Sequence, residues 1–124
     1  MNYVFIFIGG GLGAVLRSVS TICIKSIVHI TFPAGTLFVN IIGALLIGFL
    51  FSTFELHAVP DTVRLFFITG FLGGYTTFST YSLETVQYVM NGNIKNALIN
   101  ILLNNIVCII FVLLGMYLSR TLIK

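Results

Sequence analysis

The feature that most constrains this chain is a glycine- and threonine-rich segment, TGFLGGYTTFSTYSLE, which runs from Thr69 to Glu84 inside an apolar stretch. The 19 residues between Arg64 and Glu84 carry no charge, and a membrane-spanning helix needs roughly 20 such residues. We therefore expect a spanning helix that is broken at mid-membrane. Lipid cannot pair with backbone groups, so a break is tolerated only where protein or water lines it. The region Gly73 to Thr77 is accordingly a candidate site.

The composition predicts an integral membrane protein. Of 124 residues, 58% are hydrophobic and 7% are charged, which leaves too little polar surface to coat a soluble globule. Four uncharged stretches predict four spanning helices in a single domain, at about residues 3–28, 34–54, 62–90 and 95–120. The expected fold is all-α and multi-pass in the cell membrane. The opening has no basic residue before its apolar run, so we expect no cleaved signal peptide.

Several function classes are disfavoured by the charged and reactive residues. The net charge is +3, but the six cations are scattered singly, so no nucleic-acid partner is expected. Cys23 and Cys108 lie in separate spans without CxxC spacing, which predicts free thiols and no metal site. His29 and His57 are isolated from any catalytic constellation, so we expect no enzyme.

The first helix contains a misleading motif. Gly9, Gly11 and Ala14 fit the GxGxxA fingerprint of dinucleotide folds, which requires a second strand and an acidic residue about 20 positions later. The first acidic residue is Glu55, and no second strand is readable. Gly9 and Gly13 are better interpreted as a GxxxG face that lets two helix backbones approach.

Arg17 is a cation within an apolar run, which is costly unless the side chain snorkels or finds a partner. Two interpretations stay open. The side chain extends to the nearer interface, or it gathers anions in a vestibule.

The second helix carries one small, polar stripe. Thr36, Asn40 and Gly43 recur at i, i+4 and i+7 among Leu, Ile, Val and Phe. A buried amide needs partners, so Asn40 is expected to face protein or water. It either bonds another helix or lines a pathway.

The third helix supplies backbone and aromatic groups at mid-depth. Gly73 and Gly74 make the backbone permissive, and carbonyls left unpaired there suit a hard cation. Phe78 and Tyr81 share one face, and the positive edge of an aromatic ring can touch an anion. Simple packing of the two rings is the alternative.

Hydroxyl groups occupy a neighbouring face of the same helix. Thr77 and Thr80 lie on it together with Glu84, near the helix end. Glu84 is the only carboxylate in the buried polar inventory.

The fourth helix carries an amide stripe. Asn96, Asn100, Asn104 and Cys108 recur every four residues, with Asn105 beside them. Buried amides are expensive unless hydrated or paired, so they form the wall of a polar path or bond helices together. A cation path would be expected to carry Asp or Glu rings, whereas this inventory is rich in donors. It therefore favours a small anion.

The charges give the chain almost no preferred orientation. With four helices, one side holds Arg64, Arg120 and Lys124, and the other holds Lys25 and Lys95, plus Arg17 if it snorkels. A chain that inserts both ways would form an antiparallel dimer with two broken helices meeting at the midplane.

Three motifs together resemble one family. They are GGGLGAVLR (Gly9 to Arg17), GTLFVNIIGALLIG (Gly35 to Gly48) and GFLGGYTTFSTYSLE (Gly70 to Glu84). The chain resembles the CrcB/Fluc family of fluoride channels over essentially its whole length. The resemblance implies a passive, fluoride-selective channel that releases cytoplasmic fluoride. It also implies an antiparallel dimer with two ion pathways and a structural sodium ion at its centre.

The resemblance also implies roles for residues that match the motifs. Gly73 and Thr76 match positions whose backbone carbonyls hold the sodium. Asn40 and Arg17 match a pathway amide and a first-helix arginine, and Phe78 matches the first of two phenylalanines that meet fluoride edge-on. Matching hydroxyl positions are Thr77, Ser79 and Thr80.

The chain departs from the family pattern at two rings. Tyr81 stands where a second phenylalanine is usual, and Ser18 stands where an aromatic commonly follows the arginine. Asn100 and Asn104 are assigned to the pathway by helical phase. Since some organisms carry two unlike copies, the partner is either an identical chain or a related subunit.

Two other functions are compatible with four short helices. A small proton-coupled multidrug exporter is expected to carry a carboxylate in its first helix, and residues 1 to 28 contain none. A non-conducting membrane scaffold would use the Asn and Gly faces only for packing.

Overall fold

The structure is a computed structural model that describes residues 1–123, and this range is all-helical with no strand. Three long rods are α1 (Asn2–Ile27), α2 (Ala34–Leu56) and a continuous helix of α6 (Ile94–Leu102), the π-helical η2 (Leu103–Val107) and α7 (Cys108–Leu122). Each is long and apolar enough to cross a membrane. The predicted all-α class with spanning helices is confirmed.

The remaining rod is interrupted. It consists of α3 (Asp61–Arg64), the π-helical η1 (Leu65–Leu72), α4 (Gly73–Tyr75) and α5 (Phe78–Met90). Thr76 and Thr77 separate α4 from α5 in extended conformation. The structure thus contains the break that the sequence predicts, at the position predicted.

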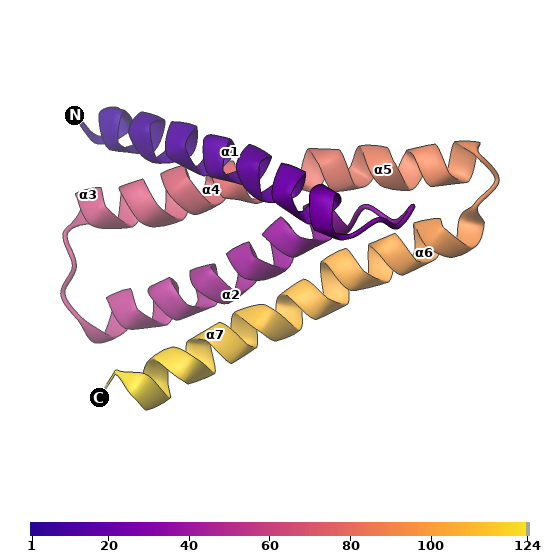
Figure 1. Ribbon diagram of the computed structural model, residues 1–124. Helices are drawn as coiled ribbons and strands as arrows, with labels where there is room; N and C mark the ends of the chain where they lie inside the picture. Colours follow the sequence, from indigo (N-terminus) through magenta and orange to yellow (C-terminus); the bar gives the residue numbers. More distant parts are fainter. Residues whose placement is uncertain (124) are drawn as a thin grey trace.

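The rods pack in two layers (Figure 1). In one layer α2 lies along α7, and in the other α1 crosses η1 and α4, while α5 pairs with α6. Both termini lie at the end of the molecule that carries the α2–α3 connection, and the α1–α2 and α5–α6 connections lie at the opposite end. The expected up-and-down arrangement is therefore present. Lys124, which the charge count includes, lies outside the described residues.

Glycines bring α1 against the interrupted rod. Gly9 and Gly13 are buried, and a methyl group on either would collide with the carbonyl oxygen of Phe66 or Phe71. A methyl group on Gly74 of the facing rod would meet the backbone of α1 as closely. Small residues allow this approach, as expected for a GxxxG face in lipid. The contact holds α1 beside the interruption.

A second glycine seam joins α2 to α7. Methyl groups at Gly48 and Gly115 would meet backbone atoms of the opposite helix, and the hydroxyls of Thr53 and Ser119 lie 2.9 Å apart. Because apolar surface gains little from leaving lipid, such close backbone packing is the main adhesive between membrane helices. The seam fixes α2, which carries Asn40.

The first prediction concerns the α1 seam. Gly13→Ala places a methyl group on the Phe71 carbonyl, whereas nothing lies within 4 Å of a methyl group at Gly11. We expect Gly13→Ala to destabilise the protein by about 1–3 kcal/mol through overpacking. Gly11→Ala should be neutral or slightly stabilising, because alanine favours helix by up to about 1 kcal/mol. Thermal unfolding in detergent measures both, and equal unfolding temperatures would contradict the seam.

Candidate functional site

The interruption of the third rod is the centre of the candidate site. Thr76 has φ −81° and ψ 158°, and Thr77 has φ −148° and ψ 112°, so neither residue continues the helix. In an α-helix each carbonyl accepts from the N–H four residues later. The interruption removes such partners.

Two side chains take the N–H groups that the helix would have used. The Thr77 N–H would pair with the Gly73 carbonyl, but it donates to Asn40 Oδ1 at 2.8 Å. The Thr80 N–H would pair with the Thr76 carbonyl, but it donates to Thr77 Oγ1 at 3.2 Å. The carbonyls of Gly73 and Thr76 are thereby released from the helix.

These two carbonyls are the ones that the family resemblance matches to sodium. Backbone carbonyl oxygens are suitable ligands for a hard cation, and Gly73 is exposed at the surface of the single chain. The residues present fit a cation that is completed from outside this chain.

Arg17 reaches the interruption from α1. Its Nη1 donates to the Thr76 carbonyl at 3.2 Å. The guanidinium is therefore held at mid-membrane depth and does not extend to the nearer interface. A carbonyl oxygen has two lone pairs, so this bond leaves Thr76 able to accept a second partner.

Three hydroxyls gather just beyond the interruption. Thr77 Oγ1 donates to Thr80 Oγ1 at 2.9 Å and lies 3.4 Å from Ser79 Oγ. Thr77 is buried, whereas Ser79 and Thr80 are exposed. The predicted hydroxyl residues are thus brought together, with the buried one at the helix N-cap.

The predicted amides form a chain of hydrogen bonds across three rods. Asn40 Nδ2 donates to the Thr77 carbonyl at 3.1 Å and to Asn104 Oδ1 at 2.8 Å. Asn104 Nδ2 donates to Asn100 Oδ1 at 2.9 Å, and Asn100 Nδ2 donates to Thr85 Oγ1 at 3.0 Å. These amides link α2, the interruption, α5 and α6. The glue and wall interpretations coincide here, because Asn40 and Asn104 also line a cavity.

The two predicted rings lie together but differ in exposure. The Phe78 and Tyr81 centroids are 5.2 Å apart in an edge-to-face arrangement. Phe78 is 74% exposed, whereas Tyr81 is 8% exposed. Asn105 Nδ2 donates to the Tyr81 hydroxyl at 3.0 Å.

Two cavities meet at Thr77. One, of about 320 Å³, lies over the released carbonyls and is bordered by Phe78, Tyr81 and the amides. The other, of about 390 Å³, is bordered by Arg17, Thr80 and Glu84. The buried hydroxyl residue therefore stands between a pocket of backbone oxygens and a pocket with a guanidinium.

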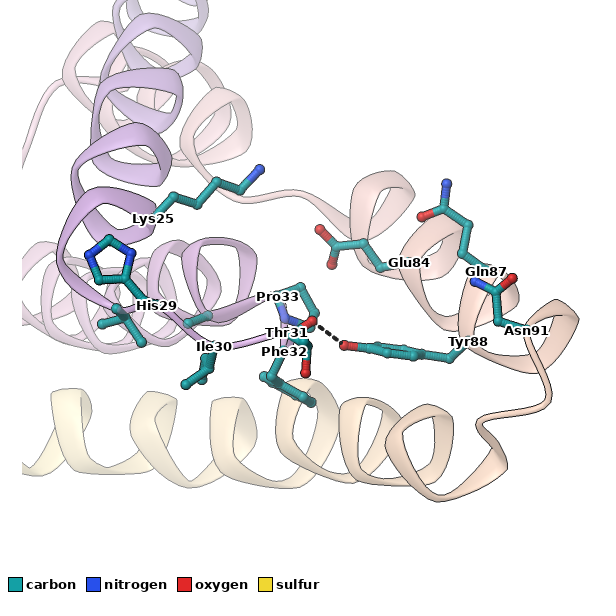
Figure 2. A pocket seen from close by; sticks show the side chains of 12 residues that line it. Lys25, His29, Ile30, Thr31, Phe32, Pro33, Glu84, Gln87, Tyr88 and Asn91 are labelled. Carbon is teal, nitrogen blue, oxygen red and sulfur yellow. Dashed lines mark hydrogen bonds between the residues drawn. The ribbon is translucent and has the colours of Figure 1, made fainter.

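A third cavity, of about 510 Å³, adjoins the second at the α1–α2 connection (Figure 2). Lys25 and Glu84 border both cavities. Thr36 Oγ1 donates to Glu84 Oε1 at 2.6 Å, while Glu84 Oε2 is buried without a partner among the described residues. Tyr88 donates to the Thr31 carbonyl at 2.9 Å and fastens the connection to α5.

The sequence reasoning missed three residues of this site. Thr85 receives the last amide of the chain, and its signal was its position one turn after Tyr81. Asn105 was noted only as a neighbour of the stripe, since the π-helical turn that directs it toward Tyr81 leaves no clear pattern. Lys25 was counted as a surface charge and borders two cavities.

Comparison with known proteins identifies relatives along nearly the whole chain. Residues 4–116 match the family model described as "CrcB-like protein, Camphor Resistance (CrcB)". A protein of Hydrogenobaculum sp. (strain Y04AAS1) is 44% identical over 120 residues, which are 96% of this chain and 98% of that protein. A protein of a Nitratiruptor species is 46% identical over 112 residues, 88% of this chain and 87% of its own.

A protein of Campylobacter fetus subsp. fetus (strain 82-40) is 41% identical over 117 residues, 94% of this chain and 91% of that protein. All three relatives are named "Fluoride-specific ion channel FluC". These relatives are channels and not enzymes, which confirms that the chain is not an enzyme. With its spanning helices, it is a multi-pass protein of the plasma membrane. The resemblance seen in the three motifs is likewise confirmed: the chain belongs to the CrcB family.

Proposed function

We propose that the chain forms a passive, fluoride-selective channel that exports fluoride from the cytoplasm. The name shared by its relatives supports the choice of anion. One observation in the chain itself carries the proposal. Beside an interrupted span, cavities are bordered by hydroxyl and amide residues, with a single carboxylate among them.

The hydroxyls are the groups best suited to replace the hydration shell of a small anion. A hydroxyl hydrogen rotates to suit its partner, so Thr77, Ser79 and Thr80 can turn their O–H groups toward a passing ion. The amides of Asn40 and Asn104 already donate within the chain. Their role in the proposal is to hold the wall in place and to accept an ion only as their own bonds exchange.

Charge along the cavities favours an anion. Arg17 and Lys25 border the cavity of about 390 Å³ that leads to the hydroxyls. Glu84 borders the same cavity, with one oxygen bonded by Thr36. Two cations against one carboxylate raise the local concentration of anions, as in other charged clefts. The edges of Phe78 and Tyr81 would add weak, uncharged contacts.

The working unit in this proposal is an antiparallel dimer, of identical chains or with a related subunit. Phe78 is 74% exposed and Gly73 is exposed, so the interrupted rod presents an aromatic ring and free backbone at the surface of one chain. A second, inverted copy would cover both. The carbonyls of Gly73 and Thr76 from each copy would then face one sodium ion at the centre.

The first test is anion flux. Purified protein in liposomes should release fluoride down its gradient without a proton gradient and should retain chloride. Proton-dependent uptake of a lipophilic cation would instead identify a multidrug exporter. Absence of both activities, with the protein folded, would favour a scaffold or a missing partner subunit.

The second test concerns Phe78. Phe78→Ile removes the ring edge while keeping an apolar side chain, and loss of one aromatic contact of up to about 1.5 kcal/mol corresponds to roughly tenfold slower fluoride flux. Phe7→Ile is the matched control, because Phe7 is 82% exposed on α1, away from the cavities. Flux that is unchanged in both variants would exclude Phe78 from the pathway.

The third test concerns sodium. A cation that binds only the assembled dimer stabilises it by about 2.7 kcal/mol at a concentration 100 times its Kd. We therefore expect a lower unfolding temperature when sodium is replaced by N-methyl-D-glucamine at equal ionic strength. Identical unfolding curves in the two salts would contradict a structural sodium ion.

A further inference from the structure

We propose that Asn105 is a positioning residue that turns the hydroxyl hydrogen of Tyr81 toward the cavity of about 320 Å³, where the phenol donates to the conducted anion. This inference rests on the proposed channel function and assigns the two residues a joint role in it. Both residues border that cavity.

The helix itself fixes the Asn105 amide. Its Nδ2 donates to the Ile101 carbonyl at 2.7 Å, one turn earlier, and to the Tyr81 hydroxyl at 3.0 Å. The surrounding segment, Leu103–Val107, is π-helical, a form that often occurs at functional sites. Along this segment Asn104 bonds toward Asn40, while its neighbour Asn105 bonds toward Tyr81.

The Tyr81 ring is equally constrained. The residue is 8% exposed, and the Phe78 ring packs against it edge-to-face at 5.2 Å. The hydroxyl therefore has little freedom to move, and only its hydrogen rotates. The orientation of that hydrogen decides what the phenol offers to the cavity.

A count of donors gives that orientation. A phenolic hydrogen prefers the plane of its ring, where it has two positions, and the oxygen accepts on the remaining side. The Asn105 amide occupies one side as a donor. Among residues 1–123 no protein group accepts from the Tyr81 hydroxyl. The hydrogen thus takes the other position and stays available to an occupant of the cavity.

A phenol in this position supplies something that a phenylalanine cannot. A ring edge carries only a weak positive potential, whereas an O–H group forms a true hydrogen bond with an anion. Fluoride is the halide that accepts hydrogen bonds most strongly. Tyr81 with Asn105 therefore acts on the occupancy of the pathway at low fluoride and on the preference for fluoride over chloride.

The experiment is a double-mutant cycle on the full chain in liposomes. It compares the unmodified protein with Tyr81→Phe, Asn105→Leu and the double variant, and measures fluoride flux as a function of fluoride concentration. We expect Tyr81→Phe to lower flux about three- to tenfold below saturation, the effect of one lost hydrogen bond, with the maximal rate little changed. Asn105→Leu should lower it in the same way when Tyr81 is present and by less than about twofold when it is absent.

Two controls separate this role from structural damage. Tyr117→Phe removes a phenol that is 65% exposed on α7 and should leave flux unchanged. Thermal unfolding shows whether each variant stays folded. Equal concentration dependence for Tyr81→Phe and the unmodified protein would overturn the inference, as would an Asn105→Leu effect that persists fully without the Tyr81 hydroxyl. An unmodified protein that passes no fluoride overturns the proposed channel function instead, and the inference with it.

Discussion

The structure depends on the pair of hydrogen bonds between the Asn40 side chain and the backbone of Thr77. The amide oxygen accepts from the Thr77 N–H at 2.8 Å, and the amide nitrogen donates to its carbonyl at 3.1 Å. An extended residue in a membrane-spanning rod would otherwise leave both backbone groups unpaired in lipid. A primary amide offers one acceptor and two donors, so it can replace a missing peptide partner and still bond a further group. That further bond reaches Asn104.

The rest of the site follows from holding this residue in place. The α2–α7 glycine seam fixes the helix that carries Asn40, and the α1 glycine seam brings Arg17 within reach of the Thr76 carbonyl. Neither arrangement tolerates a larger residue, because the closest contacts are between backbones. The released carbonyls, the hydroxyl cluster and the guanidinium are therefore consequences of where three helices are forced to approach.

Much of the site could be predicted from residue type and spacing. The uncharged stretches gave the spans, and the glycine and threonine cluster gave the position of the break. The stripe of Thr36, Asn40 and Gly43 indicated an inward face of α2, because a polar group in lipid needs a partner. The identity of each partner could not be predicted, since Asn40 and Thr77 are 37 residues apart and their pairing depends on how the rods pack. The same holds for Asn105, whose direction depends on a π-helical turn.

The sequence by itself determined an all-α membrane protein of the CrcB family with a spanning helix that cannot remain continuous. Those features depend on local quantities, namely apolar length, charge spacing and backbone freedom at Gly73 and Gly74. Only the tertiary structure decided which carbonyls are released, which amides are already bonded and where Arg17 ends. Each of these is a competition between partners on different helices, and distance and direction settle it after the helices have packed.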